Sequence, residues 1–358
     1  MNRGSIGSGL EDGGRVGRAP ARRSTRLFVS VVAAVLIVSL AGCGSAVVTP
    51  SPTVTTTPAP TSPATESPAP VTEPPPTVRE FPDVLYQEDP DGRRHVTSVY
   101  APVESGGPWP VAVMFHGGGG YPLLPDPSTI AALGAVVFAP RWSDHAPWPD
   151  AAAFRADLTG GIATLACVVR FARAEAARFG GDPSRLSVYG HSAGANHAAN
   201  IAFAEPEVST GCVAEAGSVV PEVLVLFDGD WLGLGHPVWS DLLREDPSLM
   251  DLATPWSHLE SAARMPVHVI DSVDPTLSGP YDAETLALRD PTGEFLDELE
   301  EAGALDDGIL SETDVDRLFS SRLERLGYEV ILHELVGSTH TYISAADRPV
   351  FEDAILGR

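Results

Sequence analysis

The chain has 358 residues, of which 23 are Arg, none is Lys and 48 are Asp or Glu, so its formal net charge is −25. Such an acidic surface repels nucleic acid and anionic lipid headgroups, and we expect neither as a partner. The lack of lysine excludes a Schiff-base enzyme, a P-loop ATPase and a Ser-Lys hydrolase. No Cys/His cluster has metal-ligand spacing and no GxGxxG follows a predicted strand, so we expect neither metal nor cofactor.

Residues 1–42 are predicted to be a secretory signal, because three arginines precede an apolar run over residues 27–40. The run ends in Leu-Ala-Gly-Cys43, which resembles the lipobox of bacterial lipoproteins. That resemblance implies that Cys43 is lipidated and becomes the mature N-terminus. The alternative is an uncleaved signal anchor, since residues 27–43 just reach the length of a membrane span. We favour a lipoprotein on the outer face of the bacterial cell membrane, which touches the membrane only through its lipid anchor.

Residues 43–80 consist mostly of Pro, Thr, Ser and Ala, with almost no large apolar side chain. Such a segment cannot bury a core, so it is predicted to be a disordered tether. Residues 81–358 have a suitable length for one large α/β domain. Removal of residues 1–42 would leave 17 Arg against 46 acidic residues, a net charge of −29.

Strand-like and helical runs alternate through this domain. Strands are predicted over residues 96–100, 111–116, 135–140, 186–189, 223–227, 267–270 and 329–332. Helices are predicted over residues 154–179, 193–204, 313–326 and 348–356. This alternation predicts a mostly parallel sheet that is covered by helices on both faces.

A glycine-rich loop follows the second of these strands, with the sequence His116-Gly117-Gly118-Gly119-Gly120. Four consecutive glycines cost backbone entropy on folding, and ordinary packing does not require them. A loop that must direct bare N–H groups at a reacting oxygen does require them.

The pentapeptide Gly190-His191-Ser192-Ala193-Gly194 lies between a predicted strand and a helix of small residues. Strand, sharp turn and helix are the parts of a nucleophile elbow, which would leave Ser192 exposed at a helix N-terminus. With the upstream glycine loop, this motif resembles those of the α/β-hydrolase superfamily, most closely its HGGG-type esterase and lipase branch. The resemblance covers residues 81–358.

The resemblance implies an α/β-hydrolase fold and a carboxylesterase-like serine hydrolase. The amides of Gly118, Gly119 and Ala193 would form the oxyanion hole, and the substrate would be a small-molecule or lipid ester. Residues 231–259 would form a cap over the acyl pocket, whereas the acidic segment 281–314 is interpreted as a solvated surface. Peptidase and acyltransferase activity on the same residues, or a non-catalytic binding lipoprotein, are the alternatives.

A reactive serine needs a base and an orienting carboxylate, which follow in the chain order Ser, acid, His. His340 lies in a short loop after a strand-like run, where the family carries its base. Asp274 is the favoured acid, because it lies in the loop after the strand at 267–270 and precedes a proline, as in the family. Asp271 is an alternative candidate for this acid. Asp228 and Asp230, which follow the strand at 223–227, are two more.

Cys167 and Cys212 are the two cysteines left once Cys43 is lipidated. An even pair in an oxidising compartment predicts a disulfide, which would clamp the two helices that flank Ser192. The alternative is a pair of buried free thiols.

Overall fold

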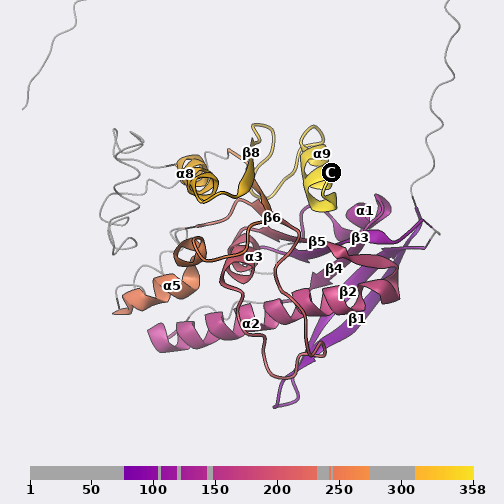
Figure 1. Cartoon of the computed structure of the whole chain (residues 1–358), viewed down its shortest axis with the longest axis horizontal. Helices are drawn as coiled ribbons and strands as arrows, with labels where there is room; N and C mark the ends of the chain where they lie inside the picture. Colours follow the sequence, from indigo (N-terminus) through magenta and orange to yellow (C-terminus); the bar gives the residue numbers. More distant parts are fainter. Residues whose placement is uncertain are drawn as a thin grey trace, which may run out of the picture. The chain divides into compact units, whose positions relative to one another are not determined.

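A computed structural model describes residues 76–103, 106–118, 122–142, 148–231, 242, 245–273 and 311–358 of the chain (Figure 1). The predicted signal, Cys43 and the predicted tether up to residue 75 lie outside the described residues. Residues 274–310, most of the expected acidic segment, also lie outside them, as does residue range 232–241 of the expected cap.

The described residues form an eight-stranded sheet with the order β1-β2-β4-β3-β5-β6-β7-β8. β2 pairs antiparallel with β1 and with β4, and every other pairing is parallel. The strands are β1 (Val78–Glu88), β2 (Arg94–Pro102), β3 (Trp109–Phe115), β4 (Val136–Pro140), β5 (Gly181–His191), β6 (Val223–Phe227), β7 (Pro266–Asp271) and β8 (Glu329–Glu334). The predicted class, a mostly parallel sheet with flanking helices, is therefore confirmed.

Helices cover both faces of the sheet (Figure 1). One face packs against α2 (Ala151–Glu175), α3 (Ala193–Ala204) and α8 (Glu312–Arg325), and the other against α1 (Pro127–Ala132) and α9 (Arg348–Leu356). The short elements η2 (Ala176–Phe179), η3 (Pro247–Leu249), α5 (Met250–Ala253) and η4 (Trp256–His258) complete the assignment. Because both faces are covered, β3 and β4 are almost wholly buried, which explains their continuous apolar sequences.

The edge strand β1 does not follow from the sequence pattern. It is half exposed and contains Pro82 and Asp83, with a register irregularity and a positive φ of 54° at Asp83. An edge strand that faces water lacks the continuous apolar run of a central strand. β1 begins at Val78, ahead of the expected domain boundary at residue 81.

The helix α2 begins where the Asp150 side chain accepts a hydrogen bond from the Ala153 amide. It is long and apolar enough to cross a membrane by length and composition. Its apolar side chains pack against the sheet in the main core cluster, so we interpret it as a core helix.

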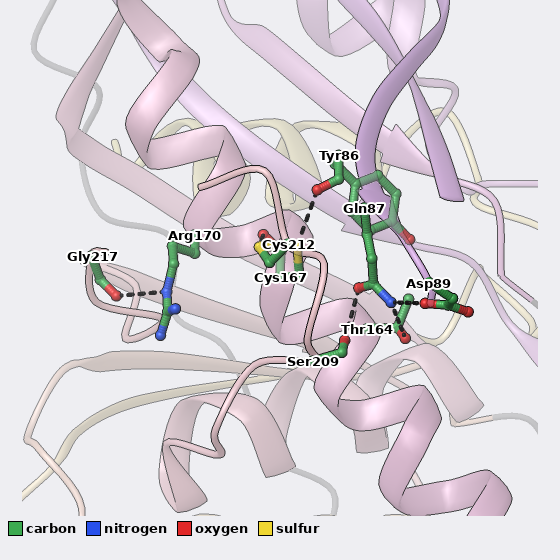
Figure 2. The surroundings of a disulfide bond; sticks show 9 residues. All are labelled: Tyr86, Gln87, Asp89, Thr164, Cys167, Arg170, Ser209, Cys212 and Gly217. Carbon is green, nitrogen blue, oxygen red and sulfur yellow. Dashed lines mark hydrogen bonds between the residues drawn. A yellow bond between two sulfur atoms is a disulfide. The ribbon is translucent and has the colours of Figure 1, made fainter. Parts of the chain in front are cut away.

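The disulfide between Cys167 and Cys212 is present, as predicted (Figure 2). Cys167 lies on α2, whereas Cys212 lies in the loop after α3, beside β1. The Val213 amide donates a hydrogen bond of 2.9 Å to the Tyr86 carbonyl of β1. The disulfide therefore ties α2 to a loop that pairs with β1, and not directly to α3 as expected.

Candidate active site

Ser192 lies in the tight turn between β5 and α3. Its φ of 54° and ψ of −123° are unusual for a residue with a side chain, and such backbone geometry costs about 1–3 kcal/mol. The Ser192 amide donates a hydrogen bond of 2.9 Å to the Phe227 carbonyl at the end of β6, which fixes the turn to the sheet. The predicted strand, turn and helix are all in place.

The two glycines of the motif are required by close backbone contacts. A Cβ on Gly190 would lie 2.2 Å from the Gly194 carbonyl oxygen, and a Cβ on Gly194 would lie 2.4 Å from the His116 carbonyl oxygen. Both distances are far inside van der Waals contact, and the opposing atoms are backbone. The elbow can therefore close only with glycine at both positions.

The glycine loop after β3 lies directly against the elbow. A Cβ on Gly117 would be 3.3 Å from the Cβ of Ser192. His116 holds this loop, because its Nδ1 lies 2.7 Å from the Gly117 carbonyl oxygen and its ring stacks on Trp142 at 5.0 Å. Gly118 follows within the described residues, whereas Gly119 lies outside them.

His340 lies in the turn after β8, where Thr339 and Tyr342 exchange backbone hydrogen bonds. Its Nδ1 is 3.2 Å from Oδ2 of Asp228, the residue that follows β6. The His340 side chain is 22% exposed, whereas that of Asp228 is 1% exposed. An imidazole held at Nδ1 by a carboxylate keeps its Nε2 free to accept a proton.

Asp228 is fixed from both sides of its carboxylate. Oδ1 accepts a hydrogen bond of 2.7 Å from the Ser272 amide, which follows β7, while Oδ2 faces His340. Its backbone φ is 46°, a left-handed conformation that aspartate tolerates better than most residues. The carboxylate is therefore anchored between two neighbouring strand ends.

The other predicted acids are placed differently. Asp271 is the buried last residue of β7, and its Oδ1 accepts a hydrogen bond of 2.9 Å from the Val273 amide. Burial raises the pKa of the Asp271 carboxyl above its ordinary value. The backbone of Asp230 exchanges two hydrogen bonds of 2.8 Å with the Asn196 side chain. Asp274 lies outside the described residues.

His191 connects the elbow to the loop that carries His340. Its Nε2 lies 2.8 Å from the His340 carbonyl oxygen, and the two rings are 4.7 Å apart. Burial, with a smaller contribution from the neighbouring His340, lowers the pKa of His191 to about 3, although the backbone hydrogen bond opposes the shift. The ring is therefore neutral, with the proton on Nε2. This contact joins segments 149 residues apart, so no local sequence pattern could have predicted it.

An apolar pocket begins at Ala193, the residue after Ser192. It encloses about 520 Å³, part of it open to solvent. Its lining includes Trp142, Trp148, apolar side chains of α2, and Asn196 and Asn200 of α3. His197 packs edge-on against Trp142 at 4.7 Å and lines the same pocket. The arrangement offers an apolar group a place beside the serine.

The strand order, the turn at Ser192 and the position of His340 after the last strand match a fold of the α/β-hydrolase type. The structure is similar to that of esterase 2 of Thermogutta terrifontis phosphoramylated by tabun, with a TM-score of 0.50 and 16% identity over 79% of this chain and 91% of that chain. It is also similar to the butyrate-bound form of the thermophilic Est2 esterase from this planctomycete, with a TM-score of 0.50 and 18% identity over the same shares. Neither a protein-family model nor a curated protein sequence matches the chain. At these identities the similarity establishes the fold.

Proposed function

We propose that this protein hydrolyses carboxylic esters through an acyl-enzyme on Ser192. The contact between His340 and the buried Asp228, at the end of the sheet where the elbow lies, is the observation that carries this proposal. The fold neighbours described as esterases and the apolar pocket beside Ala193 support a small-molecule or lipid ester as substrate.

We assign the acid of the triad to Asp228 and no longer favour Asp274. Asp228 is buried, is held by the Ser272 amide and lies within reach of His340 Nδ1. It corresponds to the alternative in which the acid follows the strand at 223–227. An acid in this position can orient the imidazole and stabilise its protonated form during turnover.

The reaction would run in two steps. The Ser192 Oγ proton moves to His340 Nε2 while Oγ bonds to the ester carbon, and the negative charge passes to the carbonyl oxygen between the amides of Gly118, Gly119 and Ala193. The ester C–O bond then breaks, and His340 gives its proton to the departing alcohol. In the second step, water gives a proton to His340 as it attacks the acyl carbon. The bond from this carbon to Ser192 Oγ then breaks, and His340 returns the proton to Oγ, which releases the acid and the free serine.

The test uses Ser192→Ala with p-nitrophenyl butyrate and a fluorophosphonate probe. Removal of a triad nucleophile lowers kcat by roughly six orders of magnitude, so we expect no measurable hydrolysis and no labelling in the variant. Labelling of the wild-type protein separates an enzyme from a non-catalytic binding lipoprotein. Equal hydrolysis by both proteins would rule out the mechanism. Labelling without hydrolysis of any ester would instead favour peptidase or acyltransferase activity.

We also propose that the mature protein is a lipoprotein attached through Cys43 to the outer face of the cell membrane. The basic segment, the apolar run and the Leu-Ala-Gly-Cys43 sequence support this location. The Cys167–Cys212 disulfide agrees with an oxidising compartment.

A further inference from the structure

A second hollow adjoins the pocket beside Ala193 and shares Trp142, Asp157 and Gly161 with it. We name it the hairpin groove, because it lies between the β1–β2 hairpin (Gln87 to Val96) and the helix α2. It encloses about 1260 Å³, including space open to solvent. A bound ligand that extends from the pocket past Trp142 would enter this groove.

The helix α2 presents two consecutive glycines to the groove, Gly160 and Gly161. Glycine within a helix destabilises it relative to alanine. Neither residue has a positive φ, and a Cβ built on either would meet no atom within 4 Å among the described residues. Neither helix packing nor backbone conformation therefore requires glycine here. A side chain at these positions would narrow the groove.

Arginines from two elements line the groove: Arg93 and Arg94 of the hairpin, and Arg141 after β4. The whole chain carries only 23 basic residues against 48 acidic ones, so this grouping runs against the overall charge. Arg141 pairs with Asp83, which lies outside the groove. Arg93 and Arg94 are exposed, and across the described ranges no hydrogen bond or ion pair is found for either guanidinium group.

The two acidic side chains of the groove are already engaged. Asp89 accepts hydrogen bonds of 2.8 Å from His95 and 2.6 Å from Gln87. Burial acts to raise the pKa of Asp89, but these hydrogen bonds, together with the smaller effects of the charges on His95 and Arg93, outweigh it and the pKa is lowered. Asp157 accepts a hydrogen bond of 2.9 Å from Trp148. Of the cationic groups that line the groove, those of Arg93 and Arg94 are thus the ones left for a ligand.

Partly buried polar contacts around Gln87 form one end of the groove, near the disulfide (Figure 2). The buried Gln87 accepts a hydrogen bond of 2.8 Å from Ser209, and it donates to Asp89 and, at 3.3 Å, to Thr164 of α2. Cys167 follows Thr164 by three residues on α2. Its disulfide ties this part of α2 to the loop that carries Ser209. This end of the groove is therefore held in shape without a ligand.

We propose that the hairpin groove binds an anionic group at the far end of the ester substrate. The inference rests on the proposed function and specifies its substrate class: an extended ester that carries a carboxylate or phosphate remote from the scissile bond. The substrate extends from the pocket beside Ala193, passes Trp142 and crosses the surface that Gly160 and Gly161 leave open. Arg93 and Arg94 then receive its charge.

The first test compares esters that differ only in a terminal carboxylate, in two series of graded chain length. In one series the charge lies on the acyl side, as in p-nitrophenyl half-esters of dicarboxylic acids against p-nitrophenyl alkanoates. In the other it lies on the alcohol side, as in ω-acetoxy carboxylates against alkyl acetates, followed in a pH-stat. In one series we expect kcat/KM to favour the anionic ester by about tenfold once the chain is long enough.

That preference should disappear in the double variant Arg93→Gln/Arg94→Gln and persist in Arg79→Gln/Arg185→Gln. The control pair removes the same charge from exposed positions that do not line the groove. No preference in either series, or a preference that survives the loss of Arg93 and Arg94, would overturn the proposal. Failure of the proposed function looks different, because the wild-type protein would then hydrolyse neither p-nitrophenyl acetate nor p-nitrophenyl butyrate.

The second test uses the glycines. Gly160→Ala and Gly161→Ala should each raise Tm by roughly 2 °C, because alanine favours the helix. Both should lower kcat/KM for the preferred long anionic ester several-fold. Gly160→Ala should leave p-nitrophenyl acetate unchanged, because Gly160 lines the groove but not the pocket beside Ala193. The control is Thr159→Ala, an exposed position on α2 that does not line the groove, which should leave both esters unchanged. Unaltered turnover of the long ester in both glycine variants would show that substrate does not cross this surface.

Discussion

The Asp228 side chain is fixed in one position by its surroundings. Its carboxylate is buried, its backbone has a positive φ, and both of its oxygens have partners on other elements. A buried charge without partners would be strongly destabilising, and here the Ser272 amide and the His340 imidazole supply them. This fixed carboxylate would stabilise a positive charge that forms on His340 during turnover.

We predict that Asp228→Asn lowers kcat by about 10⁴, because an amide in this position favours the wrong imidazole tautomer. Asp274→Asn should change kcat by only a few-fold. Steady-state kinetics on p-nitrophenyl butyrate measures both effects, and an unchanged Tm in each variant shows that the fold persists. If Asp274→Asn proved to be the crippling change, the acid would be Asp274, as the sequence first favoured.

His191 is neutral and is buried between the elbow and the loop that carries His340. Its folded-state pKa of about 3 lies below the ordinary value of 6.5. Between these two pH values the unfolded chain binds a proton that the folded chain does not bind. Folding stability contributed by this group is therefore present above about pH 6.5 and is lost as the pH falls toward 3.

The expected loss from His191 alone is roughly 2 kcal/mol in the free energy of unfolding between about pH 7 and pH 5. Urea denaturation at the two pH values measures this loss. His191→Gln keeps a hydrogen-bond donor but cannot titrate, so its free energy of unfolding should depend less on pH by that amount. The difference between the two proteins isolates His191, since His268 and His333, whose pKa values burial also lowers, titrate in both. Parallel pH dependence in the two proteins would refute the prediction.

At the scale of elements, the sequence predicts what is buried on both faces of the sheet. The strands β3, β4 and β6 have continuous apolar sequences, and the parallel pairing of β5 with β6 follows from the predicted helix between them. The edge strand β1 and the short helix α1 do not follow, because a half-exposed strand and a six-residue helix have weak periodicity. Tertiary contacts decide where these two elements form.

The same limit applies to the candidate site. The elbow around Ser192 and the loop around His340 are local patterns, so the sequence predicts their positions. The choice of acid is not local, because aspartates follow both β6 and β7, and parallel neighbours bring both strand ends to one edge of the sheet. Which carboxylate meets His340 depends on backbone geometry such as the positive φ of Asp228.

The disulfide is a prediction at the element scale, because it ties α2 to the loop that pairs with β1. The two cysteines are 45 residues apart, and a cross-link of this length stabilises the fold by about 4 kcal/mol on the chain-entropy model. Reduction should therefore lower Tm, and activity below the new Tm should persist because neither cysteine lines the pocket beside Ala193. Thiol titration of the unfolded, unreduced mature protein should find no free thiol from this pair. Two reactive thiols there would show that the bond does not form.

At the scale of the whole molecule, charge and attachment have to be reconciled. The mature chain would carry 29 net negative charges, and anionic headgroups repel such a surface. Electrostatic attraction therefore cannot hold the α/β domain at a membrane. A covalent anchor at Cys43 would do so, with residues 44–75 between the anchor and the described domain.

We predict that the native protein begins at Cys43 and carries lipid there. Intact-mass measurement should show the loss of residues 1–42 and added acyl groups, and the protein should partition into a detergent phase, since several acyl chains together anchor stably. In Cys43→Ala the signal should stay uncleaved or the protein should be mislocalised, because the lipidated side chain is missing. Ester hydrolysis should persist in that variant, since residue 43 lies outside the described catalytic domain. A native mass that still includes residues 1–42, without lipid, would instead support an uncleaved signal anchor.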